Sequence, residues 1–193
     1  IRRNARELAG RPAYREKEYG IWQGWTWAEA WDEILDLAAG LQEMGLGPGD
    51  HLAVIGRNRP YLYWSMAAAQ CCGAIPVPLY QDAVAEEMAY VLEHCGARFV
   101  VVGDQEQVDK VLEISDRLPN LHNMVFLDPR GMRKYGHGHL HDFRDVQARG
   151  REAGPEARAA LMARIDAQGA GDTCVMLYTS GTTGKPKGIM HTT

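Results

Sequence analysis

Short apolar runs that alternate with helical patterns are the feature that most restricts how this 193-residue chain can fold. By length and by their β-branched content, five runs are predicted to be strands, at 51–55, 75–79, 98–102, 123–127 and 173–178. The segments between the first four have apolar residues three or four positions apart, as helices do that cross back over a sheet. This alternation predicts an α/β fold, with a largely parallel sheet and helices on both faces.

Helix-starting residues support the same fold. Thr26 and Glu29 have the spacing of a capping box, and an apolar stripe follows them as far as Met44. Further helix starts are expected at Pro60, Asp82, Asp104 and Pro155. Each of these helices would carry the chain from one predicted strand to the next.

The pattern divides the chain into three segments. Residues 1–127 form the predicted α/β subdomain, in which prolines 76 and 78 indicate an irregular or edge strand. Residues 128–171 begin with a Gly- and His-rich stretch without a sustained period, expected to run irregularly over the surface to 154, and end in a helical connection. Residues 172–193 supply a strand and a loop. Because the chain begins at Ile1 and ends within a motif, we expect an N-terminal part of a larger protein, inactive when isolated.

Charge and composition exclude several classes of protein. The net charge of −4 provides no overall basic field to attract nucleic acid. No apolar run reaches the roughly 18 residues of a membrane-spanning helix. The four cysteines lack the spacing of a disulfide framework or a zinc site, which favours a reducing, cytoplasmic setting.

The sequence TSGTTGKPKG, at 179–188, concentrates groups that bind polyphosphate. Its glycines allow backbone N–H groups to converge on an anion, its hydroxyls donate hydrogen bonds, and its two lysines supply positive charge. The spacing is not that of a Walker P-loop, because Gly184-Lys185 is followed by Pro186. A Gly/Thr-rich segment is ordinarily a flexible surface loop. Its place directly after a buried-looking strand favours phosphate binding here.

The stretch YTSGTTGKPKG, at 178–188, resembles the phosphate-binding signature of the AMP-forming adenylating enzymes. This superfamily comprises acyl-CoA synthetases, peptide-synthetase adenylation domains and luciferases. Four upstream blocks, at 20–29, 45–60, 73–94 and 104–114, are similar to the bacterial long-chain fatty acyl-CoA synthetases. The resemblance therefore covers nearly the whole chain and places it in the large N-terminal, AMP-binding domain of such an enzyme.

The resemblance implies a long-chain fatty acid–CoA ligase of lipid metabolism that uses ATP, Mg²⁺ and coenzyme A. The nucleotide-binding positions it implies are Thr179, Ser180, Gly181, Thr182, Thr183, Gly184 and Lys187. Thr179 would also lie near Mg²⁺, and Gly184 and Gly188 would act as hinges. No residue of the chain receives a catalytic role. The adenine, ribose, acyl and CoA sites and the C-terminal domain would follow Thr193.

Other interpretations remain open at this stage. The chain could belong to an adenylating enzyme for a different carboxylic acid, or bind nucleotide without turnover. Oligomeric state, acyl chain length and peripheral contact of the whole enzyme with a membrane are not determined.

Three further groups of residues have ordinary structural explanations. The alternating histidines 137, 139 and 141 are expected to be solvated rather than metal-binding. The tryptophans at 22, 25, 27 and 31 are expected to pack in the core, and Cys71-Cys72 to be buried filler. His191 either lines the nucleotide or acyl site or packs structurally.

Overall fold

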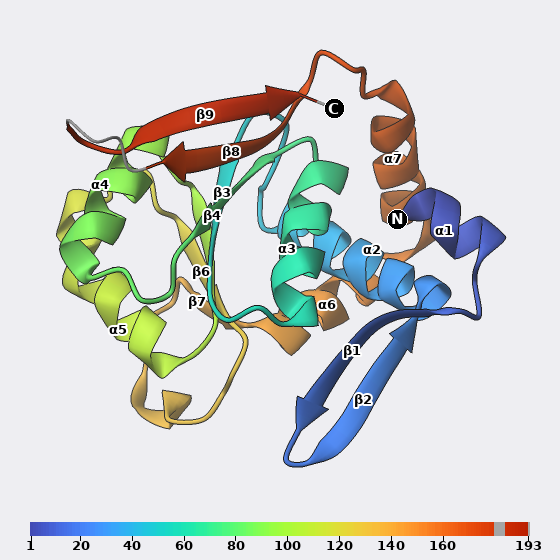
Figure 1. Ribbon diagram of the computed structural model, residues 1–193, viewed down its shortest axis with the longest axis horizontal. Helices are drawn as coiled ribbons and strands as arrows, with labels where there is room; N and C mark the ends of the chain where they lie inside the picture. The colour runs from blue at the N-terminus through green and yellow to red at the C-terminus, as the bar shows by residue number, and fades with distance from the viewer. Residues whose placement is uncertain (180–183, 193) are drawn as a thin grey trace.

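The computed structural model describes residues 1–179 and 184–192 and has an α/β architecture with helices on both faces of one parallel sheet (Figure 1). The helices are α1 (Arg2–Glu7), α2 (Trp27–Glu43), α3 (Pro60–Cys71), α4 (Ala85–Cys95), α5 (Gln105–Glu113), α6 (Phe143–Glu152) and α7 (Gly154–Ala167), with short 3-10 turns η1 (Ser115–Arg117) and η2 (Met132–Lys134). The strands are β1 (Pro12–Glu18), β2 (Ile21–Thr26), β3 (His51–Ile55), β4 (Ile75–Leu79), β5 (Phe99–Val102), β6 (Asn123–Phe126), β7 (Leu140–Asp142), β8 (Thr173–Thr179) and β9 (Lys187–Thr192).

The central sheet has the strand order β4-β3-β5-β6-β7, and all its pairs are parallel. Alternate residues of its strands face two separate cores. Leu52 and Val54 lie in a core with α2, α3 and α6, whereas Ala53 and Ile55 lie in a core with α4 and α5. The predicted parallel α/β fold with helices on both faces is therefore confirmed.

Strand β4 lies at the edge of this sheet, as its prolines predicted. The Ile75 N–H donates to the Asp50 carbonyl next to β3, so the backbone groups of alternate residues point toward β3. Pro76 and Pro78 then face the outer edge and offer it no N–H donors. Strand β8 lies beside β4 but is not hydrogen-bonded into its sheet. Instead it pairs antiparallel with β9, so the fifth predicted strand does not extend the parallel sheet.

Helix α6 forms where an irregular course was predicted. It has few buried apolar residues, Phe143 and Val146 among them, which explains the weak sequence pattern. Backbone contact with α2 holds it in place instead. A Cβ built on Gly150 would lie 1.8 Å from the Asp36 carbonyl oxygen, and one built on Gly40 would lie 1.9 Å from that of Val146. Glycine at both positions therefore lets the two helices approach closely.

The helix caps agree in part with the predictions. The capping box of Thr26 and Glu29 is present at α2, and the Asp104 side chain accepts from the Gln107 N–H at α5. Asp82 does not cap α4, which begins at Ala85 without a side-chain cap. The β1–β2 hairpin was not predicted, because charged residues on both faces of β1 hide the alternation of a half-buried strand.

Candidate functional site: the connection between β8 and β9

The predicted phosphate-binding residues lie where β8 ends and β9 begins, at the top of Figure 1. Thr179 and Lys187 are partners in the antiparallel register, and both are exposed. Gly184 lies in the connection, where a Cβ would meet nothing within 4 Å. The remaining predicted residues, Ser180, Gly181, Thr182 and Thr183, lie outside the described residues. The hairpin thus brings a hydroxyl and an ammonium group together at the base of the connection.

Tyr178 and Gly188 form the next pair of this hairpin. A Cβ on Gly188 would lie 3.1 Å from both Tyr178 Cζ and Met176 Sδ, so the tyrosine ring fills the space that glycine leaves. Gly188 therefore has a packing role in this hairpin, and the hinge role that the resemblance implied stays a prediction.

Helix α4 holds both limbs of the connection. Tyr178 Oη lies 2.6 Å from His94 Nδ1, and Tyr90 Oη donates to the Pro186 carbonyl at 3.0 Å. The His94 and Tyr178 rings meet edge to face, with centroids 5.7 Å apart. Burial raises the pKa of Tyr178 above its usual range, which keeps the phenol protonated and able to donate to His94. These contacts fix the strand ends on either side of the candidate site.

The Lys185 side chain extends to helix α4. Its Nζ lies 5.1 Å from the centroid of the Tyr90 ring, a cation–π distance. It lines a cavity of about 770 Å³ with Tyr90 and Thr179. The α4 side of this cavity carries Glu86, Glu87 and Glu93, and Arg117 on the same lining forms ion pairs with Glu86 and Glu93. The connection itself remains the predicted phosphate-binding segment.

The described residues offer few ligands for a magnesium ion. Thr179 offers one exposed hydroxyl oxygen at the end of β8. One or two protein oxygens suffice where substrate phosphates supply other ligands. Among the described residues, no group of three or more His, Cys, Asp or Glu could hold a metal ion. The site therefore fits Mg²⁺ carried in with a nucleotide, not a metal held by protein ligands alone.

The other candidate groups have structural explanations. His141 Nε2 lies 3.0 Å from Asn123 Oδ1, and the His137 and His139 rings lie 5.6 Å apart. Cys71 is buried, which raises its pKa to about 12 and makes it a poor nucleophile. His191 is exposed on β9.

Trp25 and Trp31 pack against the core as predicted, and Trp25 meets Trp64 edge to face at 5.2 Å. Trp27 is partly buried and meets the Tyr14 ring edge to face. Trp22 contradicts the prediction, because 59% of it is exposed on the β1–β2 hairpin.

Tyr90 and His94 were not predicted to be site residues. They are spaced one helical turn apart on α4, but that spacing is common on any helix. Their partners lie 96 and 84 positions further along the chain. Only the folded structure brings them to the connection.

The whole chain, residues 1–193, matches the AMP-binding enzyme family, and the protein belongs to that family. The fold and the phosphate-binding motif described above agree with this assignment. No described helix is both long and apolar enough to cross a membrane.

Two curated relatives are long-chain-fatty-acid–CoA ligases. ACSBG1 of Rattus norvegicus is 32% identical over 80% of this chain and 21% of its own length. FadD15 of Mycobacterium tuberculosis is 30% identical over 90% of this chain and 27% of its own length. The chain therefore spans about a fifth to a quarter of the length of these relatives.

Solved structures have the same fold. The anthranilate CoA ligase AuaEII, in complex with anthranoyl-AMP, superposes with a TM-score of 0.72 at 25% identity, over 88% of this chain and 30% of that one. A structure from Rhodopseudomonas palustris superposes with a TM-score of 0.74 at 24% identity, over 99% of this chain and 42% of that one, and supports the fold alone.

Proposed function

We propose that the connection between β8 and β9 binds the β- and γ-phosphates of ATP, in a ligase that activates a long-chain fatty acid and transfers it to coenzyme A. The observation that carries this proposal is the pairing of exposed Thr179 and Lys187 at the base of a Gly/Thr-rich connection, held in place by α4. The family assignment and the ligase relatives support the reaction class.

In the proposed first step, an oxygen of the fatty-acid carboxylate attacks the α-phosphorus of ATP. The bond from that phosphorus to the β-bridging oxygen breaks, and pyrophosphate leaves. Negative charge grows on the leaving group, where the Lys187 ammonium and the Thr179 hydroxyl can stabilise it without reorganising. In the second step, the CoA thiolate attacks the acyl carbonyl carbon and AMP leaves. The β8–β9 connection serves the first step.

The long-chain substrate rests on two relatives at 30% and 32% identity. The solved anthranilate ligase, at 25% identity, favours an aromatic acid as the second candidate. In a full-length enzyme that contains this sequence, pyrophosphate release with palmitate and with anthranilate separates the two. We expect release with palmitate, whereas release only with anthranilate would contradict the substrate while leaving the ATP site intact.

The phosphate site can be tested on the 193-residue chain by titration with Mg-ATP. A charge-assisted hydrogen bond contributes about 1.5–3 kcal/mol, so Lys187→Ala should weaken binding at least roughly tenfold. Lys134→Ala removes an exposed lysine from η2 and should leave the affinity unchanged. In the full-length enzyme Lys187→Ala should slow pyrophosphate release by a similar factor. Equal affinities in the two variants would contradict the role of Lys187.

A further inference from the structure

The outer face of the β1–β2 hairpin combines an aromatic ring with two cations. Lys17 pairs with Trp22 in the antiparallel register, and Arg15 pairs with Gly24, so Arg15, Lys17 and Trp22 share one face. All three are exposed, and the Arg15 guanidinium lies 4.9 Å from the centroid of the Trp22 ring. Within β1 and β2, this face carries no carboxylate.

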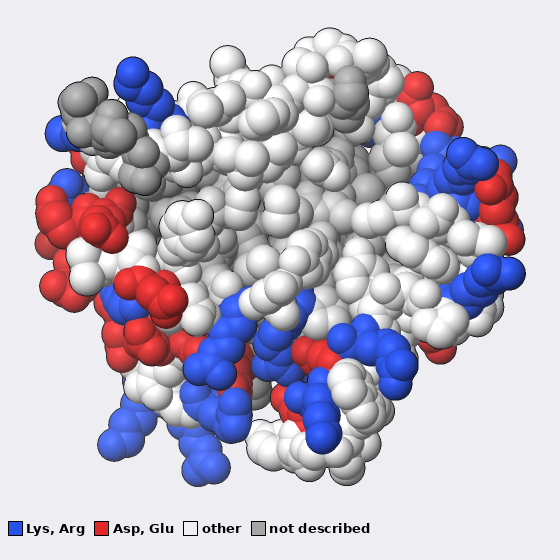
Figure 2. Space-filling model, in the orientation of Figure 1, with Lys and Arg blue, Asp and Glu red and all other residues white. Residues whose placement is uncertain are grey.

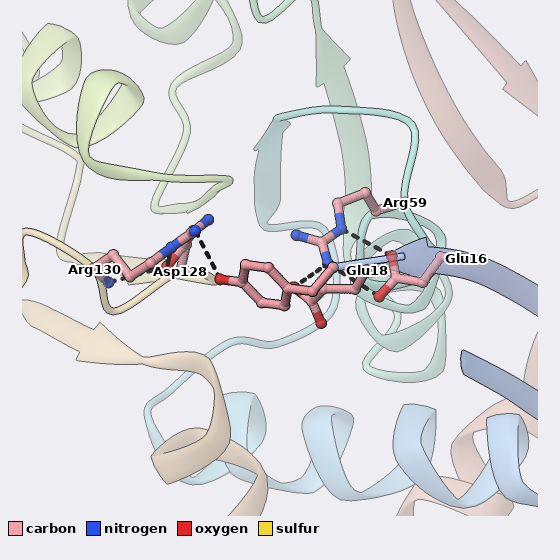
Figure 3. A network of polar contacts seen from close by, with 6 residues as sticks. Glu16, Glu18, Arg59, Asp128 and Arg130 are labelled. Carbon is pink, nitrogen blue, oxygen red and sulfur yellow. Dashed lines mark hydrogen bonds and ion pairs between the residues drawn. The ribbon is translucent and has the colours of Figure 1, made fainter. Parts of the chain in front are cut away.

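The acidic residues of β1 lie on the opposite face, toward the body of the protein (Figure 3). Arg59 donates to Glu16 at 2.8 and 3.0 Å and to Glu18 at 3.1 Å. The Glu16 side chain is only 10% exposed. The two negative charges are therefore held against a cation of the body, while Arg15 and Lys17 face solvent.

A tight turn displays apolar residues at the tip. Tyr19 and Gly20 both have positive φ, 48° and 81°, as a two-residue hairpin turn of type I′ requires. This conformation is unusual for tyrosine, and it leaves Tyr19 79% exposed. Ile21 is 64% exposed as well, but it pairs with Glu18 and so lies on the acidic face. Arg130 donates to Tyr19 Oη at 2.8 Å and so ties the tip to the loop before η2.

The tip also lies among cations. The loop that Arg130 joins to the tip continues into exposed Arg133 and Lys134. Figure 2 shows Lys and Arg side chains on both sides of the lower end of the molecule, where Figure 1 places the projecting hairpin. The chain as a whole has a net charge of −4, so this positive region is local.

We propose that this hairpin surface, made of Arg15, Lys17, Trp22 and the tip residue Tyr19, docks on an anionic lipid bilayer. Tyr and Trp rings suit the polar–apolar boundary of a membrane, and neighbouring cations are attracted to anionic headgroups. A projecting convex tip can reach a flat surface, whereas a groove-filling ligand needs a concavity. The proposal goes beyond ATP binding and does not depend on which acid is activated.

Sedimentation with vesicles tests this surface. The 193-residue chain should bind vesicles that contain phosphatidylglycerol and should bind pure phosphatidylcholine weakly. A cation at such a surface contributes about fivefold in affinity, so Arg15→Gln with Lys17→Gln should reduce binding about 25-fold. Arg6→Gln with Arg149→Gln removes two exposed cations from α1 and α6 and should change it little.

Fluorescence tests insertion of the tip, with folding of each variant checked by circular dichroism. Brominated acyl chains in the anionic vesicles should quench the tryptophan emission of the original chain, and quench Trp22→Phe much less. The proposal is overturned if binding is equal with and without phosphatidylglycerol, or if the two double variants lose binding equally. Unchanged quenching in Trp22→Phe, or self-association of the chain that Trp22→Phe abolishes, would overturn it as well.

Discussion

The two antiparallel hairpins, β1–β2 and β8–β9, present opposite kinds of chemistry to solvent. The first closes with the tight Tyr19-Gly20 turn, and side chains dominate its surface. The second joins Thr179 to Lys187 through a sequence rich in glycine and threonine. Ion pairs of Arg59 hold the first to the body, whereas aromatic contacts and hydrogen bonds of α4 hold the second. A short turn therefore suits contact with a surface, and a long glycine-rich connection suits enclosure of an anion.

The largest difference between the hairpins should come from added methyl groups. Gly188→Ala places a Cβ 3.1 Å from Tyr178 Cζ and should lower the free energy of unfolding by about 1–3 kcal/mol, because the strand is already closely packed. It should also weaken ATP binding by displacing Tyr178 from His94. The matched change in the other hairpin, Gly24→Ala, meets its nearest atoms at 4.0 Å and should have little effect. Urea unfolding measures both, and equal losses would contradict the difference in packing.

The second largest effect on the free energy of unfolding should come from removing the ion pairs of Arg59 with the first hairpin. Arg59→Ala leaves the nearly buried Glu16 carboxylate without its cation, and we expect a loss of about 1–2 kcal/mol, since the partial exposure of Arg59 screens the pair. ATP affinity should stay the same, because the ion pairs of Arg59 are with Glu16 and Glu18 of the other hairpin. A loss of ATP affinity in Arg59→Ala would show that the two hairpins are coupled.

Single phenol hydroxyls should have smaller effects. Tyr90→Phe removes the hydrogen bond to Pro186 and should lower the free energy of unfolding by about 1 kcal/mol. Tyr19→Phe removes the exposed contact with Arg130 and should lower the free energy of unfolding by less than about 0.5 kcal/mol. Urea unfolding of the two variants compares them directly, and the reverse order of effects would contradict the anchoring role of α4.

The smallest effect should be a pH dependence at the tip of the first hairpin. The Arg130 side chain, as a hydrogen-bond donor, lowers the pKa of Asp128 below its usual range. This contribution to stability is present above the unfolded pKa of about 3.9 and is lost as the pH falls through the lower folded value. Asp128→Asn should therefore flatten the acid limb of a stability–pH curve. An unchanged acid limb would show that Asp128 does not contribute to the loss of stability at acid pH.

The parallel sheet was predictable because its inner strands are short and mostly apolar; all four residues of β5 are buried. Strand β7 was not predictable, because Leu140–Asp142 contains a single apolar residue and forms a strand by pairing with β6. Helix α6 depends on backbone contact through Gly40 and Gly150, which apolar periodicity does not register.

The candidate site was predictable only in part. The motif at 178–188 identified the connection, since its residue types alone indicate phosphate chemistry. The supports Tyr90 and His94 were not predictable, because long-range contacts carry no local pattern. Trp22 and Trp25 lie on opposite faces of β2, and only Trp25 faces the body of the protein. Which of the two faces would be buried could not be predicted from the sequence.

The central claim is that the β8–β9 connection, and not another part of the fold, binds the phosphates of ATP. Amide chemical shifts of the isotope-labelled chain, recorded during titration with Mg-ATP, test it most directly. We predict shifts at Thr179, at 184–185 and at Lys187, with none in the Tyr19-Gly20 turn. Shifts confined to other regions, such as the carboxyl ends of β3 and β5, would contradict the account.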